Sequence, residues 1–167
     1  MAGMFSTKGK YALRAMADLA THDGWVSLGD VSKRQNISRK YLEQVISLMH
    51  KAGYVESLRG KGGGYRLTRK PEEYTLGQIL RAAEGSLAPV ACLDCTNDEI
   101  CPIIETCPTV AVWRDLGKVM ANYLDSKPLA DILNTHNGEL AGVTDWHPKG
   151  SRSGKTGRRR HVSNADC

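Results

Sequence analysis

Residues 37–68 read ISRKYLEQVISLMHKAGYVESLRGKGGGYRLT, and this stretch decides the fold. Its first half has apolar residues three and four positions apart, the spacing of one face of an α-helix. They are Leu42, Val45, Ile46 and Met49. Ser38 precedes the pattern as an N-cap, and Gly53 follows it at a position that suits a left-handed residue. The spacing therefore predicts one helix between these two residues.

The second half of the stretch predicts a β-hairpin with a basic, glycine-rich tip. Residues 54–58 and 65–68 have strand character, and residues 59–64 between them read RGKGGG. Glycine permits positive-φ turns, and Arg59 and Lys61 can reach DNA phosphates or a narrow minor groove. The glycines do not form a nucleotide-binding loop, because the GxxxxGK[ST] pattern is absent and no helix opens directly after them. Such a hairpin directly after a helix indicates a wing.

Two helices are expected before this stretch. Residues 11–21 have an apolar face, which consists of Leu13, Met16, Ala17 and Ala20. Ser27, with Asp30 three residues later, resembles a capping box that opens a short second helix, and Asn36 ends that helix. The short helix after Ser27 and the helix after Ser38, joined by a tight turn that ends at Ser38, predict a helix-turn-helix.

The helix after Ser38 is polar on the side away from its apolar stripe. That side mixes hydrogen-bond donors and acceptors, as base edges in a major groove demand. We expect DNA contacts from Ser38, Arg39, Lys40, Tyr41, Glu43 and Gln44, and from Arg59 and Lys61 at the wing. An ordinary amphipathic surface helix would show the same apolar spacing, so the interpretation depends on the wing that follows.

The chain divides into four expected parts. A winged helix-turn-helix covers residues 5–85 and closes with a helix that Thr75 and Gln78 cap. A cysteine-rich, irregular loop covers residues 86–108. A long helical region covers residues 109–135, with an apolar stripe formed by Trp113, Leu116, Val119, Met120, Tyr123 and Leu124. This stripe suits a dimer seam, packing onto residues 11–21, or both. Residues 142–167 are a basic tail that we expect to be disordered.

Charge is distributed unevenly along the 167 residues, which carry a net charge of +5. Residues 1–80 hold 13 Lys and Arg against 7 Asp and Glu, whereas residues 81–146 hold 4 against 10. A basic first half joined to an acidic middle suggests a part that binds a polyanion and a part with another task. No apolar run of about 18 residues predicts a membrane span, and no secretory signal is visible, so a cytoplasmic location is expected.

Four of the five cysteines lie in residues 92–107. Cys95, Cys101 and Cys107 are separated by five residues each time, so one loop can present three thiolates to a compact centre. Soft thiolates favour iron–sulfur clusters, zinc or Cu(I). Structural zinc more often shows two short CxxC-type pairs, and only Cys92 and Cys95 form one here. A disulfide or a simple thiol switch remains an alternative.

With the wing and the cysteines both in view, the chain resembles the Rrf2 family of bacterial winged-helix regulators over about residues 5–135. The matching stretches are STKGKYALR at residues 6–14, ISRKYLEQ at 37–44, LRGKGGGY at 58–65 and WRDL at 113–116. The WRDL stretch and the CxxxxxCxxxxxC spacing together are most similar to the branch that regulates iron–sulfur cluster assembly.

The resemblance implies a homodimer that binds double-stranded DNA through Glu43, Gln44 and Arg59. It also implies an iron–sulfur cluster, of two-iron or four-iron type, held by Cys95, Cys101 and Cys107. Positions that supply a fourth ligand in relatives are Val110 and Lys10 here, and neither side chain suits that role. Cys92, a solvent molecule or a residue of the partner subunit are the remaining candidates.

Together these patterns predict a mainly α-helical fold with a small β wing and a non-enzymatic, DNA-binding regulator that senses cluster, nitric oxide or redox status. Repression is the expected mode, and no membrane or small-molecule substrate is expected. Two alternatives stay open, which are a cluster-free regulator controlled by thiol oxidation or a protein partner, and a small iron–sulfur redox protein. The five histidines are scattered and suggest no catalytic arrangement.

Overall fold

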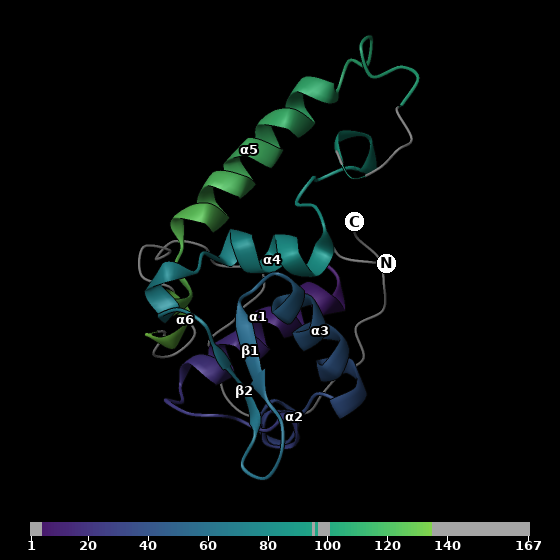
Figure 1. The fold of residues 1–167 in the computed structure, drawn as a ribbon. Coiled ribbons are helices and arrows are strands. Elements are labelled where there is room, and N and C mark those ends of the chain that lie inside the picture. Colours follow the sequence, from purple (N-terminus) through teal and green to yellow (C-terminus); the bar gives the residue numbers. More distant parts are fainter. Residues whose placement is uncertain (1–4, 95, 97–100, 135–167) are drawn as a thin grey trace, which may run out of the picture.

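The computed structural model describes residues 5–94, 96 and 101–134. Cys95 and the predicted tail at 142–167 lie outside this range. The described chain is mainly helical with one two-stranded antiparallel sheet, which confirms the predicted fold class (Figure 1). In order, the elements are α1 (Thr7–Ala20), α2 (Leu28–Gln35), α3 (Arg39–Lys51), β1 (Val55–Leu58), β2 (Gly64–Leu67), the 3-10 turn η1 (Pro71–Glu73), α4 (Leu76–Glu84), η2 (Ala91–Leu93), α5 (Val110–Ser126) and α6 (Leu129–Leu133).

The capping residues read from the sequence define the helix-turn-helix. The Ser27 and Ser38 hydroxyls accept backbone N–H groups at the starts of α2 and α3. Asn36 ends α2 in the left-handed conformation, with φ of 50°. Asparagine tolerates this conformation better than most residues, so the chain can turn from α2 into α3 over residues 36–38. Gly53, after α3, has φ of 73°, as expected for a helix C-terminus.

The wing is anchored to the connection between α1 and α2. β1 and β2 pair antiparallel from Val55 opposite Leu67 to Leu58 opposite Gly64. Val26 forms an isolated bridge with Tyr65, in which the two backbone N–H···O distances are 2.9 and 2.8 Å. A Cβ on Gly64 would collide with the Val26 backbone, so glycine permits this close approach. The wing base therefore belongs to the core, while its tip extends beside α2 (Figure 1).

Helix α1 is the central element of the core, and it is longer and rotated relative to the prediction. It begins at Thr7 instead of residue 11, because the Ser6 hydroxyl caps it and Glu84 accepts the Ser6 and Gly9 backbone amides at 2.8 and 3.0 Å. Its fully buried apolar residues are Ala12, Ala15, Met16 and Leu19. The predicted face shares only Met16 with this set, since α1 contacts α2, α3, α4, α6 and β2 and is covered on several sides.

Helix α5 joins the core at its C-terminal end. It packs on α4. The sequence pattern predicted that the long helix would pack on residues 11–21, form a dimer seam, or both. In the structure the short helix α6, after Pro128, packs on α1. The Arg81 guanidinium donates two hydrogen bonds to the Asp125 carboxylate, at 2.6 and 2.8 Å. A Cβ on Gly77 would collide with this carboxylate, so Gly77 makes room for the pair. No helix in the described part of the chain is long and apolar enough to cross a membrane.

Candidate nucleic-acid interface and cysteine segment

The predicted base-reading residues share the outer face of α3. Arg39, Lys40, Glu43 and Gln44 are exposed, and their helix buries its opposite side in the core. Arg39 and Glu43 form an i,i+4 ion pair, with 3.1 Å between Arg39 Nε and Glu43 Oε1. Both side chains are more than half exposed, so the pair is weak and either partner can turn to another ligand. The face thus offers both donors and an acceptor.

Tyr41 differs from the expectation that every polar residue of α3 points outward. It is half-buried, and its ring packs edge-on against Tyr11 of α1, with 5.2 Å between the ring centroids. The guanidinium of Arg14 lies 5.6 Å from the centre of the same Tyr11 ring. Most of the Tyr41 ring therefore fixes the start of α3 against α1, because an aromatic ring packed in this geometry has a defined orientation.

A buried polar network orients α2 behind α3, and sequence reasoning missed it. Asp18 of α1 is 5% exposed. Its carboxylate accepts two hydrogen bonds from Arg34, at 3.1 and 2.6 Å, and one from Gln35 at 2.9 Å. Arg14 donates to the Gln35 side chain and to its backbone carbonyl. Since Gln35 immediately precedes the Asn36 turn, the network holds the turn between the two helices in place.

The ionisation of Asp18 results from opposing influences. Burial raises the pKa of this carboxyl group, but hydrogen bonds from Arg34 and Gln35 and the positive charge of Arg34 outweigh it. The net pKa lies below the usual aspartate value, so the carboxylate stays charged at neutral pH. The signal in the sequence was a lone acid on an otherwise apolar helix face, but its partners are 16 and 17 residues away.

The wing separates paired charges at its base from unpaired charges at its tip. At the base, Arg66 donates to Glu56 at 2.6 Å and lies 4.3 Å from the centre of the Trp25 ring. At the tip, Arg59 and Lys61 are exposed, and neither forms an ion pair within the part of the chain that the structure describes. Gly60 and Gly62 beside them have φ of 101° and 79°, which favours glycine.

The cysteine segment connects the C-terminal end of α4 with the start of α5. Cys92 lies in η2, and Cys101 and Cys107 precede α5; all three are free thiols and half-buried. Cys95 lies outside the described residues. Among the residues that are described, no group of three His, Cys, Asp or Glu gathers closely enough to hold a metal ion. Cys92, Cys101 and Cys107 therefore do not form such a group among the described residues.

The chemistry of Cys107 suits a metal ligand. Its Sγ lies 3.4 Å from the Thr109 hydroxyl. Hydrogen bonds from this hydroxyl and from the Thr109 and Val110 backbone amides hold the pKa of the thiol below its usual range. The thiolate is the form that binds metals, so the start of α5 favours the ligating state of this residue. Val110 is the first residue of α5 and offers no donor atom in its side chain.

Helix α5 exposes an apolar face. None of its residues is fully buried, and Val112, Trp113, Leu116, Val119 and Tyr123 are 37–65% exposed. At 100° per residue these side chains fall on one side of the helix. An exposed apolar stripe of this length marks an interaction surface.

Comparisons with known proteins agree with this architecture. A family model, described as Rrf2, iron-dependent transcriptional regulator, matches residues 5–135. The HTH-type transcriptional regulator IscR of Aliivibrio salmonicida is 42% identical over 130 residues, which are 77% of this chain and 76% of that protein.

Two solved structures extend the similarity to the fold. CymR of B. subtilis, described as its global cysteine regulator, is 37% identical with a TM-score of 0.64, over 81% of this chain and all of that one. IscR of T. potens is 38% identical with a TM-score of 0.59, over 77% of this chain and 85% of that one. These relatives are transcriptional regulators and not enzymes. A recognition helix, a basic wing and a family match over residues 5–135 lead to one conclusion, that the chain belongs to the Rrf2 family of DNA-binding transcriptional regulators.

Proposed function

We propose that this regulator binds DNA as a homodimer and that a cluster held by its cysteine segment controls this binding. The observation that carries the DNA-binding half is the exposed outer face of α3, together with an unpaired basic wing tip. Glu43 and Gln44 on that face would read base edges, and Arg59 and Lys61 would contact phosphates or the minor groove. Ser38, Arg39, Lys40 and the exposed edge of Tyr41 complete the proposed interface.

The dimer is supported by the exposed apolar face of α5. Two such faces packed together would bury side chains that are otherwise in water, a favourable change of roughly 25 cal/mol per Å2 of apolar surface. A twofold axis through this seam would place two α3 helices in major grooves about one helical turn (~34 Å) apart. Residues 81–146 are acidic, so the basic residues proposed to meet DNA belong to the winged helix and not to the proposed dimer helix.

The cluster would be held by Cys95, Cys101 and Cys107, with Cys92 as the candidate for a fourth ligand. Three thiols from one segment, one of them with a lowered pKa, form a donor set of the kind that iron–sulfur clusters use. When bound, such a cluster supplies a centre that responds to iron supply, oxidants or nitric oxide. The segment joins α4 to α5, so a change in its conformation alters where the proposed dimer helix begins.

A second candidate is a regulator without a cluster, controlled by thiol oxidation or by a protein partner. The similarity to CymR favours it, because the description of that relative refers to cysteine and not to iron. The small redox protein considered from the sequence is not supported, since an electron carrier needs neither a recognition helix nor a wing.

Base reading is tested by selecting binding sites from random duplex DNA with the full chain. The expected result is a palindromic consensus with half-sites about one helical turn apart. Gln44→Ala should change the preferred base at one position per half-site, whereas the matched control Asn122→Ala, on α5, should leave the consensus unchanged. A consensus that is identical for both variants would contradict the assignment of α3.

The cluster is tested by anaerobic purification with measurement of iron, sulfide and zinc. Zinc is counted because it binds thiolate sites more tightly than Fe(II) and can displace iron. Iron and sulfide should be present in the wild type and lost in Cys101→Ala, while Cys167→Ala serves as the cysteine control. Cys92→Ala separates a four-cysteine site from a three-cysteine one. A reconstituted wild type without iron or sulfide would leave the cluster-free regulator as the function.

A further inference from the structure

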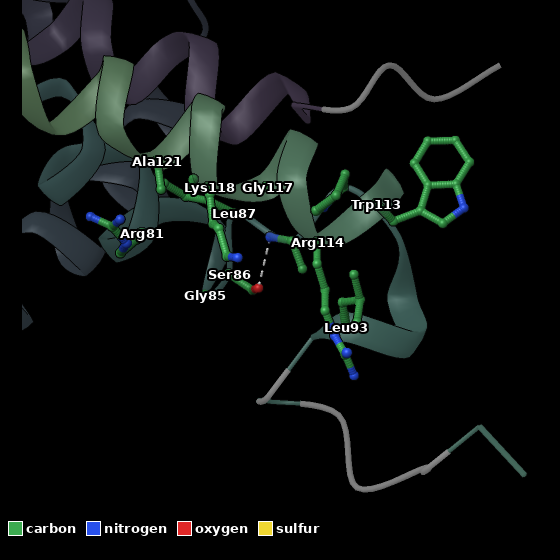
Figure 2. A pocket seen from close by; sticks show the side chains of 12 residues that line it. Arg81, Gly85, Ser86, Leu87, Leu93, Trp113, Arg114, Gly117, Lys118 and Ala121 are labelled. Carbon is green, nitrogen blue, oxygen red and sulfur yellow. Dashed lines mark hydrogen bonds between the residues drawn. The ribbon is translucent and has the colours of Figure 1, made fainter. Parts of the chain in front are cut away.

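A cavity of about 420 Å3 lies between the C-terminal end of α4, residues 85–93 and α5 (Figure 2). Its size falls in the range of sites that hold small molecules. The lining combines three cations with apolar side chains, and no acidic residue belongs to it.

The three cations differ in their availability to a ligand. Arg81 is held by its two hydrogen bonds to Asp125. Lys118 lies 3.5 Å from Asp115, but both side chains are about three-quarters exposed, so water and salt weaken this pair. Arg114 forms no ion pair within the described ranges of the chain. Two cations of the lining can therefore turn to an anion at little energetic cost.

The rest of the lining suits an apolar body. Leu87, Pro89 and Leu93 come from the segment after α4, and Ala121 faces them from α5. Gly117 keeps this segment close, because a Cβ there would lie 3.2 Å from Pro89 Cδ. Figure 2 shows the Trp113 indole directed away from the other lining side chains, with Arg81 and Arg114 at opposite ends of the group.

We propose that this cavity is a binding site for a small organic anion with an aromatic or aliphatic body. The anionic group would meet Arg114 and Lys118, and the apolar body would lie against Leu87, Leu93 and Ala121. Charge favours an anion, since all charged side chains of the lining are cations and Arg114 among them is unpaired within the described ranges of the chain. The site uses none of the four cysteines of residues 92–107, although Leu93 of its lining lies between Cys92 and Cys95.

The cavity and the proposed dimer surface lie on different faces of α5 and share one residue, Trp113. At 100° per residue, Arg114, Gly117, Lys118 and Ala121 fall on the side that faces α4 and the following segment. Val112, Leu116, Val119 and Tyr123 fall on the other side. Pairing of two chains through the exposed apolar stripe would therefore leave Arg114, Lys118 and Ala121 accessible to a ligand.

The test uses the full-length chain and two dyes that differ only in charge. The anionic probe is 8-anilinonaphthalene-1-sulfonate, and the neutral control is N-phenyl-1-naphthylamine, which has the same rings without the sulfonate. Fluorescence titration gives the dissociation constants, and equilibrium dialysis gives the stoichiometry. We expect one sulfonate dye per chain and binding at least ten-fold tighter than for the neutral dye.

The double variant Arg114→Gln with Lys118→Gln should weaken the anionic dye about ten-fold, because charge-assisted contacts are lost, and leave the neutral dye unchanged. Ala121→Leu should fill the cavity and weaken both dyes, whereas Ala111→Leu, exposed on the same helix, should weaken neither. Equal binding of the two dyes, or insensitivity to loss of the two cations, would overturn the proposal. Loss of dye binding in Val119→Ser but not in Ala121→Leu would also overturn it, since the dye would then lie on the apolar stripe.

Discussion

Replacing Asp18 by Asn tests the buried network that holds the helix-turn-helix. The change keeps the shape of the side chain and removes its charge. It also places an NH2 group where the carboxylate now accepts donors from Arg34 and Gln35. At least one of these donors then loses its acceptor, so both folding stability and the orientation of α3 should suffer.

The magnitude follows from the exposure of the two partners. Removing one partner of a fully buried ion pair costs about 3–5 kcal/mol. Asp18 is almost fully buried, with a side chain 3% exposed, but the Arg34 side chain is 39% exposed and can regain water. The free energy of unfolding should therefore fall by about 2 kcal/mol at pH 7, below the fully buried range.

The pH dependence identifies the cause. The pKa of Asp18 is lowered in the folded chain from an ordinary value of 3.8, so its stabilisation is present above that value and is lost as the pH falls through the folded-state pKa. Urea unfolding of the wild type and Asp18→Asn should differ by about 2 kcal/mol at pH 7, and the difference should shrink as the pH falls below 3.8. Asp115→Asn, which affects an exposed pair, should differ from wild type by less than about 0.5 kcal/mol at pH 7. An Asp18→Asn effect below that value at pH 7, or one equally large at pH 3, would refute the reasoning.

Three further outcomes are expected. Arg59→Ala should weaken binding to all DNA sequences and lower the slope of log affinity against log salt by about one, as measured by anisotropy at several salt concentrations, and an unchanged slope would argue against the wing contact. Glu43→Ala should broaden the selected consensus without abolishing binding, because an acid on a basic surface acts by excluding unsuitable bases, and an unaltered consensus would disprove this role. Val119→Glu should convert dimers to monomers in analytical ultracentrifugation, since it would bury two like charges at a twofold seam, and a dimer that persists would place the seam elsewhere.

Local chemistry made the winged helix readable from the sequence. Ser38, Asn36 and Gly53 each impose a backbone conformation within a few residues, so their effects on α3 and its flanking turns need no tertiary information. The same holds for the glycines of the wing tip, which lie in positive-φ positions that few other residues accept. These are the features on which the predicted helix-turn-helix and wing depended, and the structure confirms the fold class.

Contacts between distant segments were beyond the sequence patterns. Glu84 caps the start of α1 from a position 75 residues away from Gly9, and this contact moved the helix start to Thr7. The apolar face of α1 was wrong in phase because several elements cover the helix, so no single polar side marks its orientation. Tyr41 carries a polar group, and only its packing on Tyr11 shows that most of its ring belongs to the interior.

The two parts of the candidate site, the outer face of α3 and the cysteine segment, could be predicted from the sequence to different extents. Exposure of Arg39, Lys40, Glu43 and Gln44 follows from the amphipathic pattern of α3, so their place on the outer face could be predicted. Their roles at DNA, and the ligand roles of the cysteines, remain predictions. The cavity beside α5 had no signal in the sequence, because its lining joins residues that lie as much as 40 positions apart.

Helix α5 is attached to α4 at its C-terminal end. Its C-terminal end is clamped by Asp125 to Arg81 and by the backbone bonds of Lys127 to Leu76 and of Leu129 to Tyr74, while its other end projects beyond α4 toward the cysteine segment (Figure 1). Seventeen residues at 1.5 Å each give a helix about 25 Å long. A 10° rotation about the clamp would move the Cys107 end by about 4 Å. The same relation holds in reverse, so a displacement of about 4 Å at the cysteine end would reach the winged helix as a rotation of about 10°.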